Sequence, residues 1–204
     1  MSGAKRLEGN GAGLVREIAL ASRVQKALET LYRLERCADV HEFMAEADEG
    51  ERETLLVRES DDGMEMSLRV PRLGDGDLDP VCQIIEGVSH FVYLADRASR
   101  RREATQLELE VQAEVDKYVV LAASIEGFDE RRSRKLREHL YERVAYVHEA
   151  SSVEGERYRV ANQCARRFTA RLEREFVARA RFGELQGALR AFFHMGQGEK
   201  LRAA

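Results

Sequence analysis

Glu86 and His90 are the first residues whose types and spacing suggest chemistry. They lie four positions apart in the apolar stretch PVCQIIEGVSHFVYL, residues 80–94. A carboxylate and an imidazole at this spacing share one helix face, where they can form half of a metal site, an acid/base pair or a surface contact. At about 100° per residue, both fall opposite the apolar arc of this segment. We expect a solvent-exposed pair, because carboxylate sites in helical bundles need ligands that project inward.

Glu114 is a second carboxylate whose position suggests a special role. In the stretch QLELEVQAEVDKYVVLAASI it lies at the edge of the apolar arc, between Tyr118 and Leu121, so we expect partial burial. A half-buried carboxylate needs a partner or a raised pKa. We expect an ion pair with an Arg or Lys of a neighbouring helix; the alternative is a proton carrier in a metal-binding or enzymatic bundle around Glu114.

Recognised catalytic motifs are missing from the sequence. It contains no HExxH motif, no serine or cysteine nucleophile motif and no glycine-rich phosphate loop, and its remaining histidines are scattered. We therefore expect no catalytic residue, no cofactor and no bound metal.

An arginine-rich stretch, RYRVANQCARRFTARLEREFVARAR, spans residues 157–181 with eight arginines and two glutamates. Its helical pattern places Ala161, Ala165 and Phe168 on the inward side. Four arginines on the other side form a candidate site for an anion or a nucleic acid: Arg159, Arg166, Arg167 and Arg174. No aromatic platform interleaves with these arginines, although many single-stranded nucleic-acid sites contain one.

The charges of the chain are segregated. Residues 37–66 carry eleven acidic side chains against Arg52 and Arg58, although the net charge of the whole chain is only −4. An alternative to ligand binding is therefore that the acidic and arginine-rich regions neutralise each other, within the fold or across a dimer.

The segment RFGELQGALRAFFHMGQGEK, residues 181–200, predicts a short terminal helix bounded by glycines. Its large apolar side chains form a candidate surface for a partner protein: Phe182, Leu185, Leu189, Phe192 and Phe193. The alternative is that this helix folds back onto its own bundle.

The elements that must position these residues are mostly helical. Apolar spacing of three or four residues predicts helices at about 14–34, 39–47, 80–97, 105–125, 130–150, 153–180 and 183–195. Asp39 is expected to cap the second of them, and Asp79 with Pro80 to begin the third. Alternation around DDG predicts a β-hairpin at about 54–70. The expected fold is mainly α, an irregular antiparallel bundle of about six to seven helices with one two-stranded β-hairpin.

The length and composition of the chain limit what can be expected of its domain organisation, localisation and function. The 204 residues suit a single helical domain at 13–198, between flexible ends at 1–12 and 199–204. With 44% hydrophobic residues, no long apolar run and no leader pattern, we expect a cytoplasmic protein without membrane contact. The first functional hypothesis is a non-enzymatic interaction or adaptor protein that binds another protein or itself. A nucleic-acid-associated or regulatory protein using the arginine face is the alternative, and the bundle around Glu114 is the third.

Overall fold

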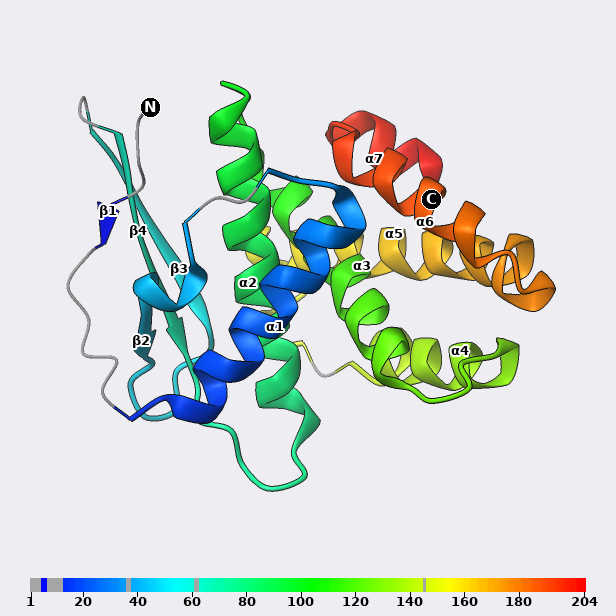
Figure 1. The fold of residues 1–204 in the computed structure, drawn as a ribbon, viewed down its shortest axis with the longest axis horizontal. Coiled ribbons are helices and arrows are strands. Elements are labelled where there is room, and N and C mark those ends of the chain that lie inside the picture. The colour runs from blue at the N-terminus through cyan, green and yellow to red at the C-terminus, as the bar shows by residue number, and fades with distance from the viewer. Residues whose placement is uncertain (1–4, 7–12, 36–37, 61–62, 145) are drawn as a thin grey trace. The chain divides into compact units, whose positions relative to one another are not determined.

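The chain folds mainly into α-helices, together with one small mixed β-sheet (Figure 1). The computed structural model describes residues 5–6, 13–35, 38–60, 63–144 and 146–204. Two units can be distinguished. Unit 1 comprises Met1–Thr30 and Leu34–Arg102, and unit 2 comprises Leu31–Arg33 and Glu103–Ala204.

The sheet of unit 1 is built around β4 (Gly63–Val70). On one side, β4 pairs antiparallel with β3 (Thr54–Ser60), which confirms the predicted hairpin. On its other side it pairs in parallel with β1 (Lys5–Arg6) and, farther along, with β2 (Met44–Glu46). The predicted two-stranded hairpin is therefore part of a larger mixed sheet. The sequence did not indicate the added strands, because strands of two and three residues are too short to produce a detectable alternation.

Helices α1 (Val15–Tyr32) and α2 (Leu78–Ser99) lie to one side of this sheet (Figure 1). The apolar face of β4 meets α2 so closely that a Cβ added to Gly87 would come within 2.5 Å of Leu68. Phe91 of α2 packs against Phe43, with their ring centroids 5.2 Å apart. The core of unit 1 therefore lies between the sheet and these helices, rather than inside an antiparallel bundle.

Two helix starts in unit 1 differ from the prediction. Residues 39–47 do not form a helix, because a single 3₁₀ turn, η1 (Val40–Phe43), leads directly into β2. The N-cap of α2 is Asp77, whose side chain accepts a hydrogen bond from the backbone N–H of Asp79 at 3.0 Å. Helix α2 therefore begins two residues earlier than the Asp79–Pro80 pair suggested.

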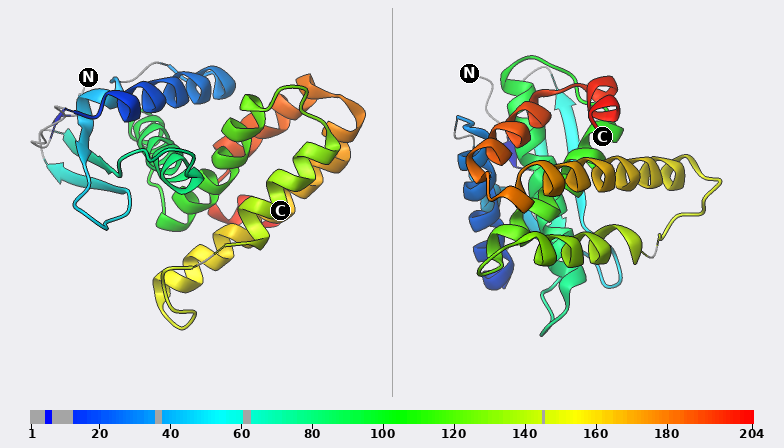
Figure 2. Two further views of the ribbon diagram at one scale, coloured as in Figure 1. Left: turned by 90° about the horizontal axis from the view of Figure 1, so that it is seen from below. Right: turned by 90° about the vertical axis from the view of Figure 1, so that its right-hand side faces the viewer.

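Among the described residues of unit 2, the regular elements are all helices. Its first helix, α3 (Gln106–Ser124), is close to the predicted range and begins with a capping box formed by Thr105 and Glu108. The further helices are α4 (Glu130–Arg137), α5 (Val153–Glu175), α6 (Phe182–His194) and α7 (Gln197–Ala203). Helices α4 and α5 lie alongside each other, as Figure 2 shows.

The predicted helix at 130–150 is too long. Helix α4 ends at Arg137 and continues as one π-helical turn, η2 (Glu138–Glu142), before the chain leaves the helix. A 3₁₀ turn, η3 (Val177–Arg179), similarly separates α5 from α6. Beyond α6, α7 occupies a stretch for which the sequence suggests a flexible end. Among the described residues, no helix is both long and apolar enough to cross a membrane.

Candidate functional site

Helix α5 carries the arginine-rich stretch and packs its opposite side into unit 2. Ala161, Ala165 and Phe168 are fully buried, as their spacing predicts. Ser152 caps the helix, because its side chain accepts a hydrogen bond from the backbone N–H of Gly155 at 3.0 Å. The helix thus holds its polar side chains in fixed positions along one face.

The four candidate arginines have different environments. Arg166 forms an ion pair with Glu142 at 3.0 Å, and Arg174 approaches Glu175 at 3.4 Å. Arg167 is exposed. Arg159 is half-buried, has no carboxylate partner among the described residues, and donates a hydrogen bond to the backbone oxygen of Gly155 at 2.8 Å. The structure therefore does not present these arginines as one uniform face.

The acidic region has arginine partners of its own in unit 1. Arg72 pairs with Glu46 at 2.6 Å, and Arg69 lies 3.6 Å from Asp48. Each of these pairs lies inside unit 1, just as the pairs of Arg166 and Arg174 lie inside unit 2. For these residues, charge is balanced within each unit, and the neutralisation of one region by the other stays a prediction.

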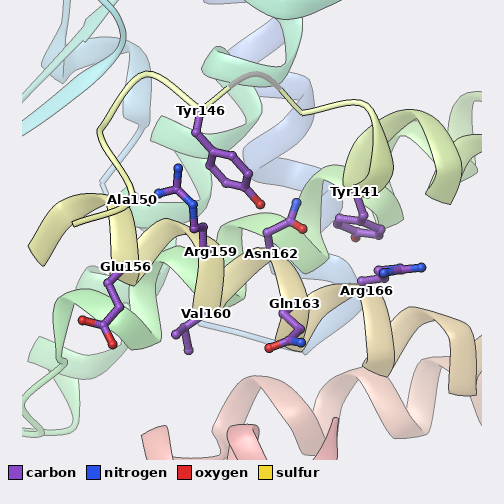
Figure 3. A pocket seen from close by; sticks show the side chains of 9 residues that line it. All are labelled: Tyr141, Tyr146, Ala150, Glu156, Arg159, Val160, Asn162, Gln163 and Arg166. Atoms are coloured by element: carbon purple, nitrogen blue, oxygen red, sulfur yellow. The ribbon is translucent and has the colours of Figure 1, made fainter. Parts of the chain in front are cut away.

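A cavity of about 410 Å³ lies against the polar side of α5 (Figure 3). Its walls come from η2, from the segment that connects η2 to α5, and from α5 itself. The lining residues are Tyr141, Tyr146, Ala150, Glu156, Arg159, Val160, Asn162, Gln163 and Arg166. Two of the four candidate arginines thus reach the cavity, while Arg167 and Arg174 do not line it.

The ring of Tyr146 provides an aromatic surface beside Arg159, although Tyr146 lies outside the arginine-rich stretch of the sequence. The guanidinium of Arg159 lies over this ring, 4.4 Å from its centroid. Burial raises the pKa of the Tyr146 hydroxyl, and the negative charge of Glu114 adds to this effect, while Arg159 opposes it. Tyr146 therefore remains a neutral hydrogen-bonding group at ordinary pH.

Asn162 is the residue of this site that the sequence reasoning missed. Its side chain is only 5% exposed, and its Nδ2 atom has no hydrogen-bond partner among the described residues. Figure 3 shows its amide rising from α5 toward the ring of Tyr146. A buried amide donor without an acceptor costs roughly 1–3 kcal/mol, so this group lowers stability unless an acceptor reaches it. Asn162 follows Arg159 by three residues, which places both on the same face of the helix. This spacing is the feature of the sequence that could have indicated its role.

The early end of α4 explains why a cavity exists here. The π turn of η2 places Tyr141 inward, where its hydroxyl donates a hydrogen bond to the backbone oxygen of Glu114 at 2.9 Å. The following segment then crosses to α5 instead of continuing the helix. Single π turns are often associated with functional sites.

Gly155 fixes the cavity wall, and we predict that its replacement by alanine disrupts that wall. A Cβ atom at this position would lie 1.8 Å from the backbone oxygen of Glu149, so the connecting segment must move away from α5. We expect a loss of about 1–3 kcal/mol in the free energy of unfolding, measured by urea denaturation. The control is Gly187→Ala on α6, because no atom lies within 4 Å of a Cβ added there. This substitution should raise the free energy of unfolding by about 0.4–1 kcal/mol. Equal effects of the two substitutions would contradict this account.

Glu114 has the ion-pair partner that its structural interpretation predicts. Its carboxylate lies 2.8 Å from Nζ of Lys117, and both side chains are almost buried. Lys117 belongs to α3 itself, whereas we expected a partner on a neighbouring helix.

The Glu86–His90 pair is not on a solvent-exposed face. Glu86 is 7% exposed and His90 is half-buried, and Tyr93 and Arg97 on the same side of α2 are also buried. The prediction is wrong because a polar arc on the helical wheel shows only the residue types, and not whether other parts of the fold cover them.

The candidate partner surface of the terminal helix is largely occupied inside unit 2. Phe192 stacks on Phe168 with ring centroids 3.9 Å apart, and Phe193 stacks on Tyr32 at 4.2 Å. Leu189 is buried and Leu185 is half-buried, whereas Phe182 is 42% exposed. Helix α6 thus folds back onto its own unit, which is the alternative considered from the sequence.

A group of metal-ligand types occurs in unit 1, where Asp39, His41 and Glu42 each bring a ligand atom within 4.8 Å of the others. His41 and Glu42 are exposed, and three surface ligands do not by themselves constitute a metal site.

The chain matches no known family model, and neither curated proteins nor solved structures show a similarity to it.

Proposed function

We propose that this chain is a non-enzymatic interaction protein that assembles by strand pairing at the free edge of β3. Among the described residues, β3 has a neighbouring strand on one side only. Leu56 is 40% exposed and Val57 is 42% exposed, one on each face of the sheet. An edge strand with uncovered aliphatic side chains is a ready template for another strand, and this observation carries the proposal.

The register of the hairpin identifies the backbone groups at this edge. Ser60 pairs with Gly63 across a two-residue connection, so this pair exchanges the ladder hydrogen bonds. Hydrogen-bonded and non-hydrogen-bonded pairs alternate along an antiparallel ladder. The pairs of Leu55 and Val57 are consequently the non-bonded ones, and the N–H and C=O groups of these two residues point away from β4, toward an added strand.

The occupant that we propose is β3 of a second copy of this chain. A two-fold axis through Leu56 places Leu56 opposite its own copy and Leu55 opposite Val57, so aliphatic side chains meet only aliphatic side chains. Thr54 then faces Arg58, which is a compatible polar pair. Each favourable cross-strand pair contributes about 0.2–1 kcal/mol, in addition to the backbone hydrogen bonds.

The same register limits the strength of association. The sequence has a glutamate at both 53 and 59, positions that face each other across this axis. Like charges in opposite positions are unfavourable, and salt screens them. The assembly should therefore be reversible and should tighten as the ionic strength rises.

Val57→Pro tests this proposal. Proline removes the outward N–H without removing a ladder bond to β4, and edge strands tolerate it. We expect the wild-type chain to show a concentration-dependent dimer by light scattering after size exclusion, and Val57→Pro to be a folded monomer. Val57→Thr, which keeps the N–H and the branched side chain, should still dimerise. A wild-type chain that stays monomeric, or a Val57→Pro dimer, would refute the proposal.

The arginine face of α5 supports nucleic-acid binding less well. Arg166 and Arg174 already have carboxylate neighbours, which a nucleic-acid backbone would have to displace. Arg159 lies against Tyr146 instead of projecting into solvent.

A further inference from the structure

The cavity on α5 carries a second inference, which is independent of the β3 edge. We infer that it binds a small organic carboxylate. The cavity volume of about 410 Å³ lies within the usual range for small-molecule sites. Its donors, its charge and its apolar walls each point to this class of ligand.

The donors are Asn162 and the two lining arginines. Asn162 is only 5% exposed, and its Nδ2 atom has no hydrogen-bond partner among the described residues. A carboxylate oxygen is the kind of acceptor that this N–H lacks, and Asn162 belongs to the lining of the cavity. Arg159 and Arg166 supply guanidinium groups, whose planar geometry matches a carboxylate.

The charge of the lining favours a monoanion. Arg166 is balanced by Glu142 at 3.0 Å, whereas Arg159 bonds only to backbone oxygens, those of Gly155 and His148. One guanidinium therefore lacks a carboxylate partner among the described residues. A single carboxylate would neutralise it, while a doubly charged phosphate would keep one unbalanced negative charge near Glu142 and Glu156.

The walls of the cavity suit the organic part of such a ligand. The rings of Tyr141 and Tyr146 belong to the lining, together with the aliphatic side chains of Val160 and Ala150 (Figure 3). Aromatic and aliphatic walls with a few convergent polar groups are typical of small-molecule sites. Benzoate combines a planar ring with one carboxylate, and it is therefore a suitable probe.

The test is a titration of the full chain with benzoate, followed by protein NMR. We expect saturable shifts of the Asn162 side-chain amide, with a dissociation constant of about 1 mM, as for other very small ligands. Benzamide, which has the same shape without the charge, should bind at least about tenfold more weakly. Inorganic phosphate should not compete with benzoate.

Two arginine substitutions on α5 complete the experiment. Arg159→Gln should weaken benzoate binding at least about tenfold, because it removes the uncompensated guanidinium. Arg167→Gln, on the same helix but outside the cavity lining, should leave binding unchanged. The inference is overturned if benzoate gives no saturable shift, if phosphate displaces it, or if the two variants bind benzoate equally well.

Discussion

Lys200→Ala is expected to lower the free energy of unfolding by about 3–5 kcal/mol, because it removes one end of a buried polar network. Lys200 is only 1% exposed, although it lies four residues from the end of the chain. Its Nζ donates hydrogen bonds to Oε1 of Gln112 at 2.6 Å and to the backbone oxygen of Phe192 at 2.8 Å. Gln112 in turn donates to Asp116 at 2.9 Å.

The expected loss is large because Asp116 stays behind. This carboxylate is 1% exposed and also accepts a hydrogen bond from the hydroxyl of Tyr32, whose pKa is raised by burial first and by Asp116 second. Without Lys200, the acceptors on Gln112 and Phe192 lose their donor, and the network keeps the buried carboxylate of Asp116 without the positive charge of this ammonium group.

Urea denaturation of wild type, Lys200→Ala and Lys135→Ala measures this effect. Lys135 lies on α4 and is exposed, so its replacement should change stability by less than about 0.5 kcal/mol. The double variant Lys200→Met with Asp116→Asn should recover part of the loss, because it removes both charges together. If Lys200→Ala merely frees α7, hydrogen exchange will accelerate in α7 alone and the global stability will not change, which would contradict the prediction.

Phe192→Ala is expected to lower the free energy of unfolding by about 3–5 kcal/mol. Phe192 is fully buried, its ring stacks on Phe168, and the ammonium of Lys200 lies 4.3 Å from its centroid. Removing the ring leaves a cavity at the meeting point of α5, α6 and α7. The surrounding helices can collapse into such a space only in part.

Phe182→Ala is the matched control, because it changes the same residue type on the same helix. Phe182 is 42% exposed and lies in the first turn of α6. Its replacement should cost less than about 1 kcal/mol. Thermal unfolding of the two variants decides between the two views of this helix: similar small losses would mean that the ring of Phe192 is not part of the core and remains free for a partner.

Local patterns in the sequence were sufficient for the elements that repeat a regular period. The helix predicted at 105–125 is α3, and the alternation around DDG is the hairpin of β3 and β4. Both predictions succeed because side chains three or four residues apart, or two apart, share a face within a single element. The buried stripe of α5 follows from the same rule.

Contacts between segments that are distant in the sequence determined the features of the fold that have no regular period. β1 and β2 become strands only because β4 offers them an edge, and the π turn after α4 brings the connecting segment against α5. Burial of Asn162 and Lys200 depends on which segments cover them.

The sequence by itself thus determined the helical class, the hairpin and the inward stripes, since these depend on spacing along the chain. Only the tertiary structure decided which polar groups are enclosed: the amide of Asn162, the ammonium of Lys200 and the carboxylate of Glu86. The physical reason is that the cost of burying a polar group depends on its surroundings in three dimensions, and a helical period contains no information about them.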